Sequence, residues 1–308
     1  MKHNLRAGVL YVGMAYLIWG LFPLYWKLLQ HVSSDEILTN RIVWSFVFMI
    51  LLLAVIKKWR IFQETFKEII QFPKKGLALF VASVLVSGNW FIYIWAVNHD
   101  RIIETSLGYY INPLVSVLLG VLVLKESLSK AQILAFILAL IGVLIQTLSY
   151  GEFPWVALGV AFTFSFYSLA KKMIKVDSSV GLTLETMSIT PFAILFMMIL
   201  SQRGQLALFH QSLSTDLLLI GGGILTAIPL LFFAKGAQQI PLYLVGFLQY
   251  ITPTMTLLLG IFVYNEPFTT NQLVSFMFIW TALFLFSLSQ MKWGKAVVRK
   301  KAKNEFLA

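Results

Sequence analysis

The sequence has no cysteine and little charge. Asp, Glu, Lys and Arg make up 12% of its 308 residues, against about 25% in soluble domains. Without cysteine the chain has no disulfide, thiol nucleophile or cysteine-ligated metal. The four histidines, His3, His31, His99 and His210, form no His-Glu-x-x-His pair, so we expect no metal and no cofactor. Because 59% of the residues are hydrophobic, the chain is predicted to be an all-α integral membrane protein.

Ten segments are apolar over the roughly 20 residues that a membrane-spanning helix needs. The first has no small-residue cleavage site, which predicts a retained span and not a signal peptide. Residues 57–76 place Trp, Phe and Ile at helical spacing among Lys and Glu, a pattern that predicts a short amphipathic helix on the membrane surface. The ten expected spans are 7–26, 37–56, 77–97, 105–124, 131–149, 154–172, 180–200, 216–235, 242–264 and 271–290.

Lysine and arginine are distributed unevenly among the connections. Of the 24 in the chain, 20 lie in the two termini or in the connections that ten spans place on the same side. Because cytoplasmic connections are enriched in Lys and Arg, this bias predicts that both termini are cytoplasmic. The net charge of +11 is explained by this topology, so we expect no nucleic-acid partner.

The chain contains an internal repeat. Residues 110–132 align with residues 250–272 without a gap, and nine of the 23 positions are identical, including Tyr-Ile-x-Pro, a Gly, a Glu and a Gln. The copies are five spans apart, so they cross the membrane in opposite directions. Inverted repeats are typical of secondary transporters, whose substrate binds between the repeats. The predicted domains are a first five-helix repeat (1–150), a second one (151–291) and a basic cytoplasmic tail (292–308).

Six motifs together resemble one family of membrane carriers. They are WGLFPLYWK (19–27), EILTNRIVWS (36–45), NWFIYIWAVN (89–98), ETSLGYYINPL (104–114), GLTLET (181–186) and LQYITPT (248–254). Over residues 7–290 the chain resembles the RarD-type branch of the EamA family, in the drug/metabolite transporter superfamily. The resemblance implies a ten-helix carrier of small organic molecules in the bacterial plasma membrane. One departure from the family pattern is Asn40, where a His usually precedes the Arg.

Three ionisable residues lie within the expected spans, where each costs about 2.5–3.5 kcal/mol by insertion scales. Arg41 is expected near the outer face, whereas Glu185 and Lys235 are expected in the inner half and would form an ion pair. Arg41 and Glu185 occupy similar places in the two repeats, so we expect each to line a central cavity. Glu185 is the candidate proton carrier, and the alternative is that both residues form permanent structural pairs. The partners expected for Arg41 are Glu36, Asp100, Glu104 or an anionic substrate.

Aromatic and amide side chains are frequent in the first, third, fourth and ninth spans. Many lie too deep to belong to an interfacial aromatic belt, which predicts a cavity for an amphipathic or aromatic solute. For any single residue, ordinary core packing is the alternative. Besides Arg41 and Glu185, the residues expected to line the cavity are Trp19, Asn89, Tyr93, Tyr109, Asn112, Gln249 and Tyr250.

Proline and glutamate recur at equivalent positions of the repeat. Pro113 and Pro253 are expected to bend the fourth and ninth spans, because proline removes one helical hydrogen bond. Glu126 and Glu266 end these spans and are expected to brace the short connections by binding backbone N–H groups. The residues expected to cap the helices that follow are Ser129 and Thr269.

Small residues mark two helix contacts. Ala131, Ala135, Ala139 and Gly142 form a stripe on the fifth span, which predicts a close helix contact and, through the fifth and tenth spans, a homodimer. Residues 221–223, three glycines in the eighth span, are expected to allow another helix to approach closely.

Transport is the leading functional hypothesis, and two other classes remain open. A membrane enzyme would need a nucleophile–base set, but the sequence contains neither Gly-x-Ser-x-Gly nor His-Glu-x-x-His, nor a nucleotide-binding P-loop. A non-transporting receptor or scaffold would need a larger exposed domain than the connections provide. The expected partners are a small-molecule solute and membrane lipid, which the basic tail is expected to contact.

Overall fold

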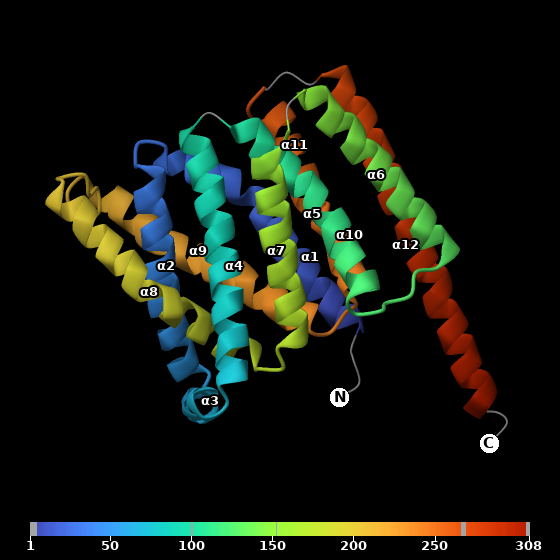
Figure 1. The fold of residues 1–308 in the computed structure, drawn as a ribbon, viewed down its shortest axis with the longest axis horizontal. Helices are drawn as coiled ribbons and strands as arrows, with labels where there is room; N and C mark the ends of the chain where they lie inside the picture. The colour runs from blue at the N-terminus through green and yellow to red at the C-terminus, as the bar shows by residue number, and fades with distance from the viewer. Residues whose placement is uncertain (1–4, 100, 152, 266–268, 306–308) are drawn as a thin grey trace.

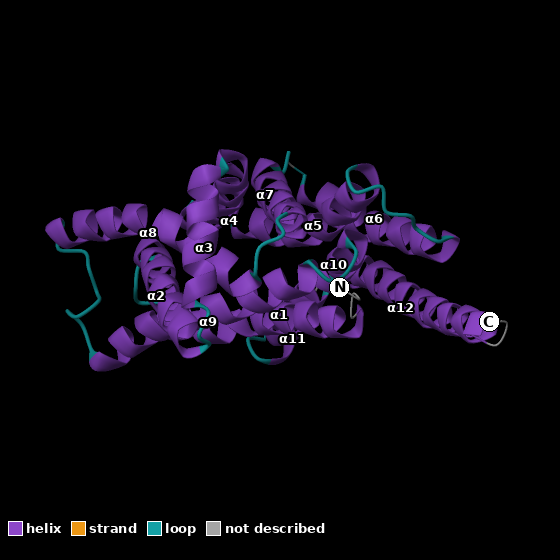
Figure 2. Cartoon of the chain, turned by 90° about the horizontal axis from the view of Figure 1, so that it is seen from below, coloured by secondary structure: helices purple, strands orange, loops and turns teal. Residues whose placement is uncertain are grey.

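The computed structural model describes residues 5–99, 101–151, 153–265 and 269–305, and these residues form helices and connections without strands (Figure 1, Figure 2). A short 3-10 helix, η1 (Lys27–Leu29), follows the first helix. The α-helices are α1 (Leu5–Trp26), α2 (Ser34–Val55), α3 (Trp59–Gln71), α4 (Pro73–Asn98), α5 (Ile102–Leu122), α6 (Lys130–Tyr150), α7 (Trp155–Met173), α8 (Ser178–Gln202), α9 (Leu213–Ala237), α10 (Leu242–Gln249), α11 (Ile251–Phe262) and α12 (Thr270–Glu305).

Nine segments of the described chain are long and apolar enough to cross a membrane, one of them formed by α10 and α11 together. This is the composition of an integral membrane protein. The expected span that falls outside this set is α7, which carries Lys171 and Lys172 in its last turn. It packs against α4 and α5.

The amphipathic helix expected at 57–76 forms α3, which lies across one end of the bundle (Figure 1). Phe62 and Thr65 are buried against the bundle, whereas Trp59 is exposed. Lys58, just before α3, forms a 2.6 Å ion pair with Asp177, the N-cap of α8. This contact joins the end of α2 to the start of α8. The start of α1 and the end of α12 lie toward the same end of the molecule as α3 (Figure 1).

Helices α6 and α12 pack against each other at one side of the bundle (Figure 1). Ala135 and Ala139 are fully buried, and Ser275 of α12 donates a 2.7 Å hydrogen bond to the carbonyl of Gly142. A Cβ atom on Gly142 would lie 2.7 Å from the Ser275 carbonyl oxygen. The small-residue stripe therefore faces α12 of the same chain, so the predicted homodimer would have to use other surfaces of these two helices.

The ninth expected span is divided into α10 and α11 at Tyr250. Pro253 has no N–H to donate to the carbonyl of Gln249, which weakens the helical hydrogen bonding at this point. The equivalent Pro113 leaves α5 continuous. The two halves therefore differ at the positions where bends are expected.

Both expected caps are present. Ser129 Oγ accepts a hydrogen bond from the N–H of Gln132 (3.4 Å), and Gln132 Oε1 accepts one from the N–H of Ser129 (2.7 Å). Thr269 and Gln272 form the same reciprocal pair at the start of α12. This capping box explains why the repeat retains Gln at both positions.

The basic tail expected at 292–308 continues α12 as far as Glu305. Residues 306–308 lie outside the described chain.

Candidate functional site

Glu185 lies about two turns into α8 and forms a buried ion pair. Its Oε1 is 2.7 Å from Lys171 Nζ, and both side chains are at most 3% exposed. The Tyr167 hydroxyl donates to the other carboxylate oxygen at 3.4 Å. The expected pairing of Glu185 with Lys235 is therefore wrong, because Lys235 is exposed and its ammonium group lies 4.4 Å from the ring centroid of Tyr11.

The physical reason for this correction is the direction in which the last turn of α7 faces. Sequence reasoning counts Lys171 with the cytoplasmic connection at the end of the expected span 154–172, but the last turn of α7 packs in the bundle and buries Lys171 beside Glu185. At the end of α9, the Lys235 side chain is exposed on the outside of the bundle, beside the ring of Tyr11. A buried carboxylate left without a cation would be strongly destabilising. Lys171, and not Lys235, supplies the countercharge that the buried Glu185 requires.

A small crevice of about 20 Å³ lies beside Glu185. Its walls come from α2 and α4 of the first half and from α7, α8 and α9 of the second half. It therefore lies between the two expected repeats and combines hydroxyl, aromatic and charged groups. The polar and aromatic residues that line it with Glu185 are Ser45, Ser83, Ser87, Trp90, Tyr167 and Thr186.

Arg41 lies near the start of α2, toward the end of the bundle that is distant from α3. Its Nε donates a 3.0 Å hydrogen bond to Thr226 Oγ1 of α9. The guanidinium carbon lies 4.8 Å from the ring centroid of Trp26 and 5.1 Å from that of Trp90. The ring centroid of Phe22 lies 6.0 Å away, so three aromatic rings accompany this cation.

The acidic residues expected beside Arg41 have other partners or lie outside the described chain. Glu36 accepts hydrogen bonds from two backbone N–H groups of the α8–α9 connection. Glu104 forms a 2.7 Å ion pair with Arg101, and Asp100 is not among the described residues. In the described part of the chain, Arg41 thus has no carboxylate within ion-pair distance.

Tyr93 and Tyr109 complete the surroundings of Arg41. Their ring centroids are 6.2 Å apart, and both residues are within electrostatic range of the guanidinium. Like Arg41 itself, both are half-buried. The structure brings together these three sequence-predicted cavity residues. Glu185 lies apart from them, toward the end of the bundle where α3 packs against α8.

Trp90 links the two charged positions. It approaches Arg41 on one side and lines the crevice that contains Glu185 on the other. Trp90 belongs to the aromatic set from which the sequence predicts a cavity, but sequence reasoning did not select Thr226 or Lys171 as site residues. The available signal for Trp90 was its position next to Asn89 in the motif NWFIYIWAVN.

The amide candidates hold helices together and leave two polar atoms without partners. Asn89 Nδ2 donates to the carbonyl of Val160 at 2.8 Å, joining α4 to α7. Asn112 Oδ1 accepts a 2.7 Å hydrogen bond from Ser165. Among the described residues, Asn112 Nδ2 and Gln249 Oε1 are buried without a hydrogen-bond partner. These two atoms are available to a water or a solute.

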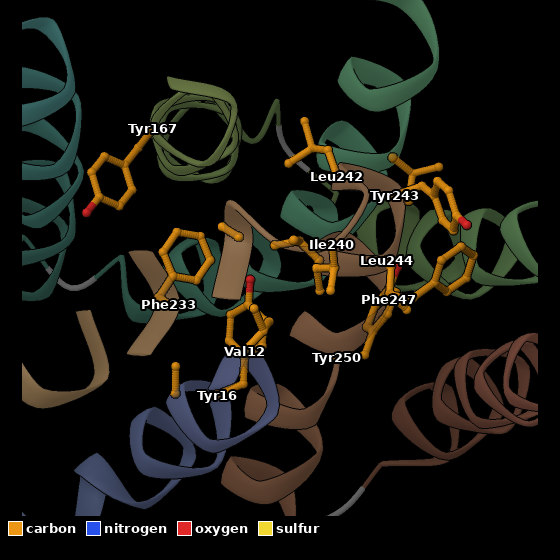
Figure 3. Packing of buried hydrophobic residues seen from close by; sticks show 14 of the residues in the cluster. Val12, Tyr16, Tyr167, Phe233, Ile240, Leu242, Tyr243, Leu244, Phe247 and Tyr250 are labelled. Carbon is orange, nitrogen blue, oxygen red and sulfur yellow. The ribbon is translucent and has the colours of Figure 1, made fainter. Parts of the chain in front are cut away.

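Of the two remaining aromatic candidates, Tyr250 lies in the core (Figure 3), and the half-buried Trp19 packs against this core. Trp19 packs against Phe164 and Phe233, each at a centroid distance of 5.7 Å. Tyr250 donates a 3.4 Å hydrogen bond to the carbonyl of Tyr110. In this conformation both side chains make contacts of ordinary core packing, the alternative stated for single aromatic residues.

Two glutamates connect the halves through backbone N–H groups. The carboxylate of Glu36 accepts from residues 207–208 at 2.8 Å. The carboxylate of Glu126 accepts from residues 242–243 at 2.7 and 2.9 Å. Glu126 is expected from the sequence to brace the short connection that follows its own span, but its carboxylate binds the start of α10, across the halves. Its repeat counterpart Glu266 lies outside the described residues.

No metal centre is visible in the described ranges, where no group of three His, Cys, Asp or Glu side chains is placed to hold an ion. The chemistry of the candidate site is therefore that of one buried ion pair, one aromatic-flanked guanidinium and several hydroxyl and amide groups.

Comparison with known proteins places this geometry in a family. The profile of the EamA-like transporter family matches residues 6–148 and again residues 154–288. A solved structure described as "Crystal structure of protein" has a TM-score of 0.68 at 17% identity, over 91% of this chain and 97% of that one. This likeness concerns the fold alone.

Curated relatives are similar over almost their whole length. "Uncharacterized transporter YojE" of Bacillus subtilis is 50% identical, over 96% of this chain and 99% of the relative. "Protein RarD" of Escherichia coli is 43% identical, over 91% and 94%. "Protein RarD" of Streptomyces exfoliatus is 37% identical, over 94% and 91%. The EamA-like transporters are not an enzyme family. This chain belongs to the EamA-like transporter family, in its RarD-type branch, and is a multi-pass membrane transporter.

Proposed function

We propose that the protein is a secondary active transporter that moves a small organic metabolite or drug-like solute across the bacterial plasma membrane by alternating access. The observation that carries the proposal is the crevice between the two halves, with a buried ion pair at Glu185 and the aromatic-flanked Arg41 in the other half of the bundle. Binding of solute near the midplane between repeats is the arrangement typical of such carriers.

The topology that we propose has ten spans in two inverted repeats, with both termini in the cytoplasm. The Lys and Arg bias and the repeat at 110–132 and 250–272 support it. In this arrangement α7 is the sixth span and completes the set of ten, and its polar character reflects a central position between α4 and α5. The Arg41 side of the bundle then faces outward, and the α3 side faces the cytoplasm.

Contacts between the halves at the two ends support alternating access. Glu36 binds residues 207–208 at the outer end, and Glu126 binds residues 242–243 at the inner end. Opening the cavity to one side requires the halves to separate there while they stay joined at the other end. Hydrogen bonds between a carboxylate and N–H groups are strong yet reversible, which suits this requirement.

Glu185 is the proposed proton carrier. Protonation of a buried carboxylate would weaken its attraction to Lys171, so proton binding and helix packing would be coupled. A variant, Glu185→Gln, separates this role from a structural one. Loss of pH dependence in the remaining flux supports coupling, and undiminished pH-dependent flux contradicts it.

Solute flux through the purified protein distinguishes transport from an enzyme or a receptor. Proteoliposomes are loaded with a pooled extract of bacterial small molecules, and release is followed by mass spectrometry against protein-free liposomes. We expect at least one compound to leave faster, with saturation as its concentration rises. Release equal to that of the protein-free liposomes would contradict the proposal, and conversion of a compound would indicate an enzyme.

A further inference from the structure

The surroundings of Arg41 indicate the charge of the solute. Arg41 is half-buried, and its long side chain points among α1, α4 and α9 through contacts with Trp26, Trp90 and Thr226. A guanidinium group has five N–H donors. In the described part of the chain, hydrogen bonds occupy only the donor on Nε. The terminal nitrogens therefore remain able to bind a further acceptor.

Two other cations of the spans, Lys171 and Lys235, have different surroundings. Lys171 is neutralised by Glu185 at 2.7 Å. Lys235 is exposed on the outside of the bundle, and its ammonium group lies over the ring of Tyr11. The Lys171–Glu185 pair has no net charge. Among the described residues, the positive charge of Arg41 is therefore not compensated by an acidic side chain. A cationic solute would be repelled there, and a neutral solute would leave the charge unbalanced.

We infer that Arg41 binds the acidic group of the transported solute, which is a small organic anion with an apolar or aromatic body. This inference rests on the proposed transport function. A guanidinium matches carboxylate and phosphate oxygens with two parallel N–H bonds. Trp26 and Trp90 provide apolar faces beside the cation, and Tyr93 and Tyr109 provide hydroxyl groups within electrostatic range. The anionic head group of a phospholipid offers the same acceptor atoms, so the test separates the two sources.

The test uses the whole purified protein in a neutral detergent, with phenylacetate and phenyl phosphate as anionic probes. Phenylacetamide is the neutral isostere and phenethylamine is the cationic counterpart. Thermal unfolding is measured against probe concentration, because a ligand that binds the folded state raises its apparent stability. We expect stabilisation by the anions, at apparent dissociation constants at least about tenfold lower than for the neutral isostere.

Variants assign the effect to Arg41. We expect Arg41→Gln to weaken anion binding about tenfold or more and to leave the weak binding of phenylacetamide unchanged. Arg41→Lys retains the charge and is expected to keep part of the preference. The control is Arg203→Gln, which removes an exposed cation beyond the end of α8. It is expected to leave the binding of all the probes unchanged. The comparison of probes on the unaltered protein stands even where a variant does not fold.

Three outcomes overturn the inference: equal stabilisation by phenylacetate and phenylacetamide, no stabilisation by any anionic probe, and stabilisation by vesicles containing phosphatidylglycerol but not by the small anions. Flux of the same probes in proteoliposomes is measured separately. Anion binding at Arg41 without flux would contradict the transport proposal alone, and flux without anion preference would contradict this inference alone.

Discussion

Ser45 Oγ donates a 2.8 Å hydrogen bond to the carbonyl of Gly223, at a point where the backbones of α2 and α9 meet. A Cβ atom on Gly223 would lie 2.3 Å from the Cβ of Trp44 and 2.5 Å from its carbonyl carbon. Backbone atoms cannot move aside at low cost, so only glycine permits this approach. The same two helices carry Arg41 and Thr226, and their spacing therefore sets the position of the guanidinium.

Gly223→Ala is expected to destabilise the protein by about 1–3 kcal/mol, as overpacking does in a tight core. Thermal unfolding in detergent measures the change. Gly13→Ala is the matched control, because a Cβ on Gly13 in α1 meets no atom within 4 Å. An equal effect of the two substitutions would refute the role of Gly223.

Glu185→Gln is expected to lower stability by about 3–5 kcal/mol, because it leaves the ammonium group of Lys171 buried without a countercharge. The double variant Lys171→Met, Glu185→Gln removes both charges and is expected to recover much of the loss. Unfolding of the two variants under the same conditions provides the comparison. A double variant no more stable than the single one would show that the pair is not the cause.

The carboxyl group of Asp177 makes the stability of the folded protein depend on pH in the acid range. Burial raises the pKa of its carboxyl group, but hydrogen bonds from Lys58, Ser179 and Val180 and the charge of Lys58 outweigh this, so the net pKa is lowered. Its contribution is therefore complete above the unfolded pKa of about 4 and is lost as the pH falls through the lower folded value. We expect the stability difference between the unaltered protein and Asp177→Asn to shrink as the pH falls below about 4.

Measurement of thermal unfolding across the acid range checks this dependence. Glu64→Gln is a suitable control, because Glu64 is an exposed partner of Arg60 and contributes little. A difference between Asp177→Asn and the unaltered protein that stays constant with pH would argue against the assignment.

Glu36→Gln is expected to loosen the connection between α8 and α9. An amide oxygen is a weaker acceptor than a carboxylate for the N–H groups of residues 207–208. Hydrogen exchange at these two amides should accelerate by about tenfold or more. Asp35→Asn, one residue earlier in the same helix turn, should leave their exchange unchanged. Equal protection in all three proteins would exclude Glu36 as the group that holds this connection.

The cysteine-free sequence allows a direct test of whether α7, the sixth expected span, crosses the membrane. Phe153 and Lys175 are exposed residues on either side of α7. In intact cells, a membrane-impermeant maleimide is expected to label the Phe153→Cys variant but not Lys175→Cys, which reacts only after the cells are opened. The same labelling of both variants in intact cells would mean that α7 does not cross the membrane.

Local features were predictable from the sequence, and contacts between distant segments were not. The amphipathic helix α3 and the caps at Ser129 and Thr269 depend on neighbouring residues, so their patterns are readable along the chain. The ion pair of Glu185 with Lys171 depends on where α7 ends and which side of it faces α8. The expected span ends at residue 172 and α7 ends at Met173, so the helix end was predicted closely. Hydropathy alone does not show whether a lysine in the last turn of a helix faces the bundle or points away from it.

The glutamate contacts across the halves have a consequence for biosynthesis. Glu36 and Glu126 are synthesised early, but the N–H groups that they bind lie at residues 207–208 and 242–243. Until those residues leave the ribosome, both carboxylates must stay in water or with other donors. Final packing of the first half is therefore a late event, and a chain truncated after residue 150 would contain two carboxylates whose native partners never arrive.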